Sequence, residues 1–195
     1  MTFDYSEFFN LSGGYLPSEL RLRFAPTDTA FHRPFARFVW TKQLWEGLLT
    51  PAGPVVFVRD EGSRLFDWVP TTHSVVVISP RVCEALNAAS ATGWRTFPIR
   101  VADVPASEGY VGLSILGRAQ ANWSLSEKIE RPHQHDVPAW RGLFFDPESW
   151  DGSDLFLVSG QIVVTSAVRE ALTTAELTNI ELVPIELFVR EWEES

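Results

Sequence analysis

One stretch of this chain occurs twice, and this repetition constrains the fold more than any other feature. Residues 76–99 align without a gap with residues 162–185, at an offset of 86 positions. Nine of the 24 aligned positions are identical, namely Val77, Val82, Glu84, Ala85, Leu86, Ala89, Thr92, Pro98 and Ile99. This similarity predicts two copies of one structural unit; the alternative is two unrelated segments that share common helix signals.

Each copy predicts a strand, a helix and a second strand. The short β-branched run Val76–Ile78 is typical of a buried strand. Ser79 then stands where the N-cap of a helix is expected, and Thr165 takes its place in the second copy. Gly93 and Asn179 tolerate a left-handed backbone, so we expect them to end the two helices.

The predicted helices carry matching apolar stripes. In both copies the apolar residues recur at i, i+3, i+4 and i+7, the spacing that places them on one helix face. These residues are Val82, Ala85, Leu86 and Ala89 in the first copy, and Val168, Ala171, Leu172 and Ala175 in the second. The strands that follow contain Pro98 and Pro184, which favours edge strands or bulges. The repeat indicates a scaffold and by itself points to no functional residue.

Composition predicts a soluble protein with one well-packed core. The chain has 195 residues, of which 45% are hydrophobic, enough for one sizeable domain or two small ones. It contains no apolar run of about 18 residues, the length of a membrane-spanning helix, and no secretory signal at its start. Its single cysteine, Cys83, excludes an internal disulfide framework and is interpreted as a small apolar residue. We therefore expect a cytoplasmic protein.

These observations predict an α+β fold. We expect one domain over residues 1–195, with two similar β-α-β units related by internal duplication and mixed sheets flanked by short helices. The predicted parts are an N-terminal extension (1–54), a first repeat unit (55–101), a variable middle (102–154) and a second repeat unit (155–189).

Local signals add expectations about individual strands. Val55–Arg59 predicts a strand that returns through a hairpin loop at 60–63 into a partner at 65–69. Its first part, Val55 to Val58, lacks proline and is a candidate for an exposed edge strand. Val158–Gln161 predicts a tight hairpin, and residues 31–49 are compatible with either a helix or an extended segment.

The net charge of −9 is unevenly distributed. Residues 143–195 contain 11 acidic side chains and only two basic ones, Arg169 and Arg190, whereas residues 1–142 are balanced. A surface this acidic repels nucleic acids and anionic membranes and attracts basic proteins. The alternative is a solvated face that only keeps the protein soluble.

Catalytic and metal-binding patterns are scarce. His133, His135 and Asp136 form the only histidine–carboxylate cluster, which with a further ligand would suit a transition metal. Pro132 and Pro138 flank the cluster, which favours a polar loop with incidental histidines. No nucleophile elbow and no glycine-rich phosphate loop is present. We therefore predict a protein that is not an enzyme, with no catalytic residues, no metal and no cofactor.

Two tryptophans are candidates for contact with a partner. Trp140 and Trp150 lie in polar, irregular segments, where a large aromatic side chain can anchor an interface as well as pack internally. We predict a partner-binding surface made of these two tryptophans and the neighbouring acidic side chains Asp146, Glu148, Asp151 and Asp154.

The order of several motifs resembles the eleventh numbered immunity-protein family of bacterial polymorphic toxin systems, including its myxobacterial relatives. The resemblance spans about residues 60–188. It is carried by Asp67–Val69, Val82–Leu86, Pro98, Tyr110–Leu116, Asp154–Phe156, Val168–Leu172, Leu177–Ile180 and Pro184. Many myxobacterial relatives also contain paired cysteine motifs that suggest zinc; this chain has none, so the resemblance implies no metal here.

The resemblance implies a small cytoplasmic protein that binds a co-encoded toxin and blocks it, with no catalytic residues. The partner would be a cognate toxin domain, expected to be basic, rather than nucleic acid or a membrane, and a homo-oligomer is compatible with this role. Two alternatives stay open at the level of sequence. One is a metal-assisted hydrolase that uses His133, His135 and Asp136. The other is a self-associating structural module that pairs through edge strands.

Overall fold

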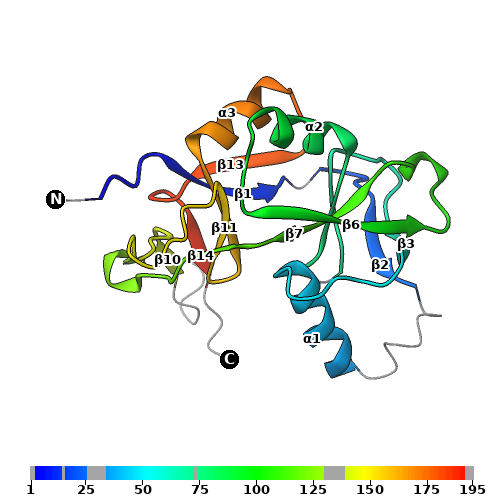
Figure 1. The fold of residues 1–195 in the computed structure, drawn as a ribbon, viewed down its shortest axis with the longest axis horizontal. Coiled ribbons are helices and arrows are strands. Elements are labelled where there is room, and N and C mark those ends of the chain that lie inside the picture. The colour runs from blue at the N-terminus through cyan, green and yellow to red at the C-terminus, as the bar shows by residue number, and fades with distance from the viewer. Residues whose placement is uncertain (1–2, 15, 26–33, 73, 130–138, 192–195) are drawn as a thin grey trace.

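The computed structural model describes residues 3–14, 16–25, 34–72, 74–129 and 139–191 (Figure 1). Within these ranges, three α-helices accompany strands that form three separate sheets, which confirms the predicted α+β class in a single domain. None of the helices in the described ranges has the length and apolar character needed to cross a membrane.

The largest sheet has six strands in the order β2-β3-β6-β7-β5-β4. They are β2 (Arg21–Phe24), β3 (Val55–Glu61), β6 (Trp94–Val101), β7 (Val111–Ile115), β5 (Val76–Ile78) and β4 (Trp68–Pro70). The sheet curls until the chain beside its two end strands meets. Leu22 on β2 forms a bridge to Thr71, which follows β4, and the Leu22 carbonyl accepts a hydrogen bond from Thr72 N at 2.9 Å. The enclosed core includes Leu22, Phe57 and Phe97.

A second sheet has five strands in the order β13-β1-β12-β11-β8, and a third has the order β14-β10-β9. The strands of the second are β13 (Ile180–Pro184), β1 (Phe8–Gly13), β12 (Gln161–Thr165), β11 (Leu155–Val158) and β8 (Gly117–Arg118). Those of the third are β14 (Val189–Glu191), β10 (Ala139–Arg141) and β9 (Glu127–Ile129). Two 3₁₀ turns, Pro105–Ser107 and Trp123–Leu125, lie in the connections.

Helices α2 (Pro80–Ala88) and α3 (Ser166–Thr174) lie side by side and cover both large sheets from the same side (Figure 1). The predicted apolar stripes face inward: Val82 and Leu86 are 1% exposed, and Val168 and Leu172 are 0% and 2% exposed. They join one core cluster that draws on both sheets. Helix burial, rather than intrinsic propensity, therefore stabilises these nine-residue helices.

The two predicted β-α-β units have the same local structure. The first unit is β5-α2-β6 and the second is β12-α3-β13, and both helices begin and end at positions 86 residues apart. Each unit holds a third, antiparallel strand between its own two strands: β7 in the first and β1 in the second. The shared arrangement is a structural observation, whereas its origin by internal duplication stays a prediction.

The two middle strands also have the same register. The paired residues are Val76–Leu113 and Trp94–Ile115 in the first unit, and Ile162–Leu11 and Ile180–Gly13 in the second. The middle-strand partners are therefore 102 positions apart at both edges. Since β1 precedes the first copy and β7 follows it, the middle strands lie outside the repeated segment.

The predicted helix starts are correct, but their caps differ. Ser79 has extended backbone angles and its hydroxyl accepts a hydrogen bond from Val82 N at 3.4 Å, as an N-cap does. Thr165 takes the same backbone conformation but makes no side-chain cap bond. Its hydroxyl donates to Asp154 instead, at 3.1 Å.

The predicted helix ends are wrong by three residues. The first residues with positive φ after the helices are Ser90 (51°) and Glu176 (49°), not Gly93 and Asn179. A helix needs its left-handed residue directly after the C-cap, and that position falls earlier than the glycine. Gly93 has another role: it has a φ of +83°, and a Cβ there would collide with the carbonyl oxygen of Leu155.

Two predictions about β3 are also wrong. β3 lies between β2 and β6, so Val55 to Val58 is not an edge strand. β3 pairs with β2, not with residues 65–69, so the hairpin through 60–63 does not form. Gly62 does have a positive φ, but its backbone lies against the carbonyl group of Glu19. The long-range pairing of β3 with β2 therefore overrides the local turn signal.

Three other local expectations are resolved. The hairpin at Val158–Gln161 is confirmed, with Ser159 and Gly160 both at positive φ, as its two-residue turn requires. Pro184 lies in the edge strand β13, also as expected. Pro98 is the last residue of β6 that pairs with β7, and the pairing of β6 with β3 starts one residue later, at Ile99. Pro98 therefore has a paired strand on one side only, which suits a residue without a backbone N–H.

Within residues 31–49 the helical alternative is correct, because α1 covers Pro34–Trp45. The carbonyl groups at its C-terminal end are bound by other parts of the chain. Ser114 Oγ donates to Leu44 O at 2.6 Å, and Arg95 Nη2 donates to Gly47 O at 2.7 Å. These bonds fix α1 on the side of the molecule opposite α2 and α3 (Figure 1).

Candidate functional site

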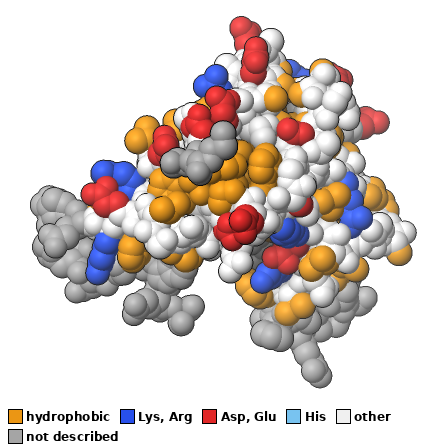
Figure 2. All heavy atoms as spheres, turned by 60° about the vertical axis from the view of Figure 1, so that its left-hand side comes forward, with side chains coloured by type: hydrophobic (Ala, Val, Ile, Leu, Met, Phe, Trp, Pro, Cys, Tyr) orange, Lys and Arg blue, Asp and Glu red, His pale blue; other side chains and the backbone are white. Residues whose placement is uncertain are grey.

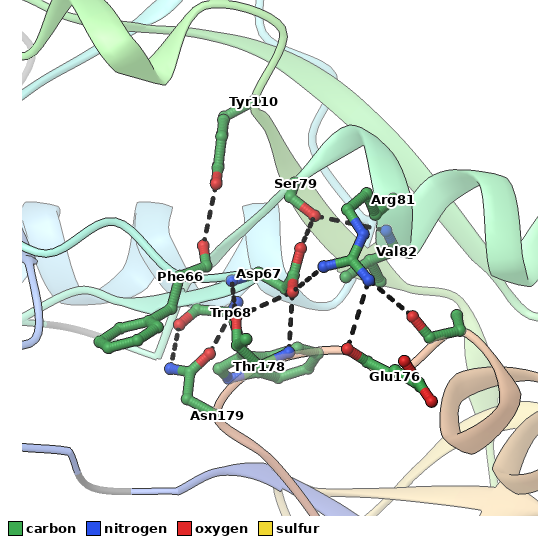
Figure 3. Close-up of polar contacts among 11 residues, drawn as sticks. Phe66, Asp67, Trp68, Ser79, Arg81, Val82, Tyr110, Glu176, Thr178 and Asn179 are labelled. Carbon is green, nitrogen blue, oxygen red and sulfur yellow. Dashed lines mark hydrogen bonds and ion pairs between the residues drawn. The ribbon is translucent and has the colours of Figure 1, made fainter.

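A buried carboxylate joins the two units (Figure 3). Asp67, which precedes β4, is 4% exposed. It accepts hydrogen bonds from Ser79 Oγ at 2.6 Å and Arg81 Nη1 at 2.9 Å, both at the start of α2. It also accepts from Thr178, through the backbone N at 2.7 Å and Oγ1 at 2.8 Å. Because Thr178 follows α3, Asp67 ties the first unit to the second.

Asp154 makes the reciprocal connection. It precedes β11 as Asp67 precedes β4, and it accepts hydrogen bonds from Thr92 N at 3.0 Å and Thr92 Oγ1 at 2.8 Å. Thr92 belongs to the first unit and is aligned with Thr178 at the repeat offset. The two aspartates therefore form a pair of crossed clamps, in which each carboxylate holds the loop after the other unit's helix.

Both clamps favour ionised carboxylates. Burial alone would raise the pKa of Asp67, but hydrogen bonds from Ser79 and Thr178 and the charge of Arg81 lower it below its usual value. Burial likewise opposes ionisation of Asp154, and the bonds from Thr92 and Thr165 lower its pKa. Their acceptor positions are occupied by the chain itself, so neither geometry is that of a general base awaiting a substrate.

Glu19 and Asn179 extend the contact between the units. Glu19 is 6% exposed; its pKa is raised by burial, although the hydrogen bond from Asn179 favours ionisation. The Asn179 amide donates to Glu19. It also donates to Trp68 O, and its oxygen accepts from Trp68 N at 3.1 Å (Figure 3). Asn179 therefore bonds to β4 as a neighbouring strand would.

The predicted partner-binding segment forms a turn whose carboxylates bind backbone groups. Asp146 accepts from Glu148 N at 3.1 Å. Asp151 accepts from Arg118 N at 3.1 Å and from Ser153 N at 3.0 Å. Asp151 and Glu148 are exposed, so both remain available at the surface. Their role in partner binding stays a prediction.

Trp150 is packed among aromatic rings. Its ring lies 5.2 Å from that of Phe8 and 5.6 Å from that of Phe156, measured between centroids. Its indole Nε1 donates to Ser153 O at 3.0 Å. The side chain is half-buried and helps to hold the turn in place. Figure 2 brings the left-hand side of Figure 1 forward, and there apolar side chains form a continuous area next to acidic ones.

Trp140 lies apart from this turn along the chain, in the middle strand of the smallest sheet. Its cross-strand neighbours are Lys128 on β9 and Arg190 on β14. Side chains that are directly opposite one another share one face of a sheet. Trp140 therefore has cationic neighbours, whereas the prediction grouped it with acidic residues. The predicted surface is not uniform in charge.

The remaining candidates, His133, His135 and Asp136, lie outside the described residues. Within the described ranges, no group of three or more His, Cys, Asp or Glu side chains is placed to bind a metal ion. The metal-assisted hydrolase stays a prediction, which metal analysis of the purified protein tests.

A groove that was not predicted from the sequence lies between α2 and α3. It has a volume of about 670 Å³. Its lining residues are Arg81, Glu84, Ala85, Ala88 and Ala89 from the first unit, and Ala167, Glu170, Ala171, Thr174 and Ala175 from the second. These sets correspond position by position at the repeat offset. The signal was present in the alignment, since Glu84 and Glu170 are identical although an exposed helix position does not require glutamate.

Two smaller grooves flank the central one and also correspond to each other. One, of about 510 Å³, contains Cys83, Asn87 and Thr96; the other, of about 390 Å³, contains their counterparts Arg169, Thr173 and Leu182. The helical face is thus grooved in the same way on both units.

Comparison of the whole chain with models of known protein families and with curated proteins found no match.

Proposed function

We propose that the protein is an immunity protein, which binds a co-encoded bacterial toxin and neutralises it by stoichiometric protein–protein interaction. The supporting observation is the exposed acidic charge of the C-terminal third. Among the side chains that the structure describes there, the exposed acidic ones are Glu148, Asp151, Glu170, Glu176, Glu181 and Glu186. A surface of this kind steers a basic partner into contact and raises the association rate.

The scaffold suits a binding role. The carboxylates Asp67 and Asp154 hold the two units together by hydrogen bonds within the chain. A surface held rigid before binding loses less conformational entropy when the complex forms. Inhibition then follows from occupation of the toxin's functional surface, with no chemical step.

The test is co-purification with the product of the adjacent toxin gene, together with rescue of cells that express that toxin. We expect a complex of one protein with one toxin domain, and survival only when both are expressed. An unrelated toxin domain of similar charge is the control, because general electrostatic attraction would retain both. The proposal fails if the adjacent toxin neither binds nor is neutralised.

A further inference from the structure

The groove between α2 and α3 combines an apolar floor with acidic flanks. Its floor consists mainly of alanine methyl groups, including Ala85 and Ala171. Glu84 on α2 and Glu170 on α3 are both exposed and occupy equivalent positions. The groove is therefore acidic on both helices that form it.

The charges of these two glutamates are not used within the described part of the chain. Neither forms an ion pair there. Arg81, the one cationic residue that lines the groove, is engaged elsewhere: it pairs with Asp67 at 2.9 Å and donates to Ala175 O at 2.6 Å. Two carboxylates thus remain for a partner of opposite charge, next to an apolar floor.

The dimensions of the groove fit one helix. α2 and α3 have nine residues each, so each is about 13 Å long. They run in opposite directions, since Arg81 at the start of α2 binds the carbonyl of Ala175 at the end of α3. Small side chains along both helices allow the backbone of a third helix to approach closely. Two to three turns of a helix span the groove.

We propose that this groove is the docking site for an amphipathic helix of the toxin. The helix would present small apolar side chains to the alanine floor and a Lys or Arg to each of Glu84 and Glu170. This inference rests on the proposed function and specifies where on this molecule the toxin binds. The equivalence of the two units adds a consequence: the two glutamates contribute similarly, although they are 86 residues apart.

The test compares charge reversals in the groove with a matched reversal outside it. The dissociation constant for the adjacent gene's toxin domain is measured for Glu84→Lys, Glu170→Lys, the double variant and Glu108→Lys. Each groove variant is expected to weaken binding about tenfold, and the double variant more. Glu108→Lys, an exposed reversal outside both the groove and the acidic C-terminal third, is expected to change the dissociation constant less than about threefold. Unfolding curves confirm that the variants fold.

A second variant blocks the groove without a change in charge. Ala88→Trp places a large ring on an exposed floor position and should abolish binding while the protein stays folded. If wild type binds the toxin and the groove variants bind it equally well, the docking site is wrong and the proposed function stands. If wild type does not bind, both fail. If the variants change only self-association in light scattering, a second copy occupies the groove and the proposal is overturned.

Discussion

At the scale of single residues, the contacts of Asp67 explain an otherwise unfavourable choice. A buried charge is tolerated only when it is paired and hydrogen-bonded, and this carboxylate has four donors, one of them a cation. Asp154 has three donors from Thr92 and Thr165 and lacks the cation, because Ala167 stands where the first unit has Arg81. The two clamps should therefore differ in strength.

Asp67→Asn is expected to lower the free energy of unfolding by about 2–4 kcal/mol. The amide keeps the shape but removes the charge that Arg81 pairs with, and its NH₂ group faces donors. Asp154→Asn should lower it by less. Urea unfolding measures both, with the exposed Glu108→Gln as the control. Equal losses at Asp67 and Asp154 would show that Arg81 adds nothing to the clamp.

Glu19 is expected to give the free energy of unfolding a pH dependence opposite in sign to that from Asp67 and Asp154. Its pKa is raised in the folded protein, so the unfolded chain, with a pKa near 4.3, ionises first as the pH rises. Stability linked to Glu19 is thus present at low pH and lost as the pH rises through the folded pKa. The lowered pKa values of Asp67 and Asp154 act the other way and stabilise above the pKa of the unfolded chain.

Glu19→Gln should therefore remove the loss of folding stability that ionisation of Glu19 causes as the pH rises. The variant is expected to gain stability relative to wild type as the pH rises above the unfolded pKa of about 4.3, because glutamine can still accept the bond from Asn179. Urea unfolding at several pH values measures the difference. A constant difference across this range would mean that Glu19 does not titrate differently in the folded state.

At the scale of elements, the two helices end in the same strained way. Ser90 and Glu176 follow their helices with φ near +50°, a conformation that disfavours residues with a Cβ. Glycine is the usual residue there, and neither copy has it. Both units thus forgo some helix stability at matching positions.

Ser90→Gly and Glu176→Gly are each expected to raise the melting temperature, by an amount that corresponds to about 0.5–1 kcal/mol. Glu84→Gly, at an exposed position in the middle of α2, is the matched control and should lower stability by about 0.5–1 kcal/mol, because glycine disfavours a helix interior. Calorimetry distinguishes the three. If Ser90→Gly and Glu176→Gly both destabilise, then contacts of their side chains outweigh the backbone strain.

The elements also show what sequence could and could not reveal. The stripe of Val82 and Leu86 predicted α2 correctly because helix periodicity is a local property. The strand partners were not predictable in this way: β3 formed no hairpin because its partners are β2 and β6. The repeat alignment showed that Thr92 and Thr178 are the same residue type, but it could not show why. Each threonine binds an aspartate that lies beside the other unit, and this contact depends on the tertiary structure.

At the scale of the whole molecule, the crossed clamps connect the units in both directions. The middle strand of the second unit comes from the N-terminal segment, and β11 runs from Asp154 beside that unit. The core cluster under α2 and α3 contains residues of both units. Each large sheet also packs a cluster of its own, but the cluster under the helices and the hydrogen bonds of both clamps are shared, which predicts that the units unfold together.

Thr92→Val and Thr178→Val test this coupling, because each removes one hydroxyl from one clamp and keeps the volume. Each is expected to lower the free energy of unfolding by about 1–2 kcal/mol. Tryptophan fluorescence and far-ultraviolet circular dichroism should still give coincident transitions, since loss of either clamp weakens both units. If either variant instead separates the two signals into distinct transitions, the units are independent domains joined at a surface, and a rigid groove between α2 and α3 would no longer follow from the fold.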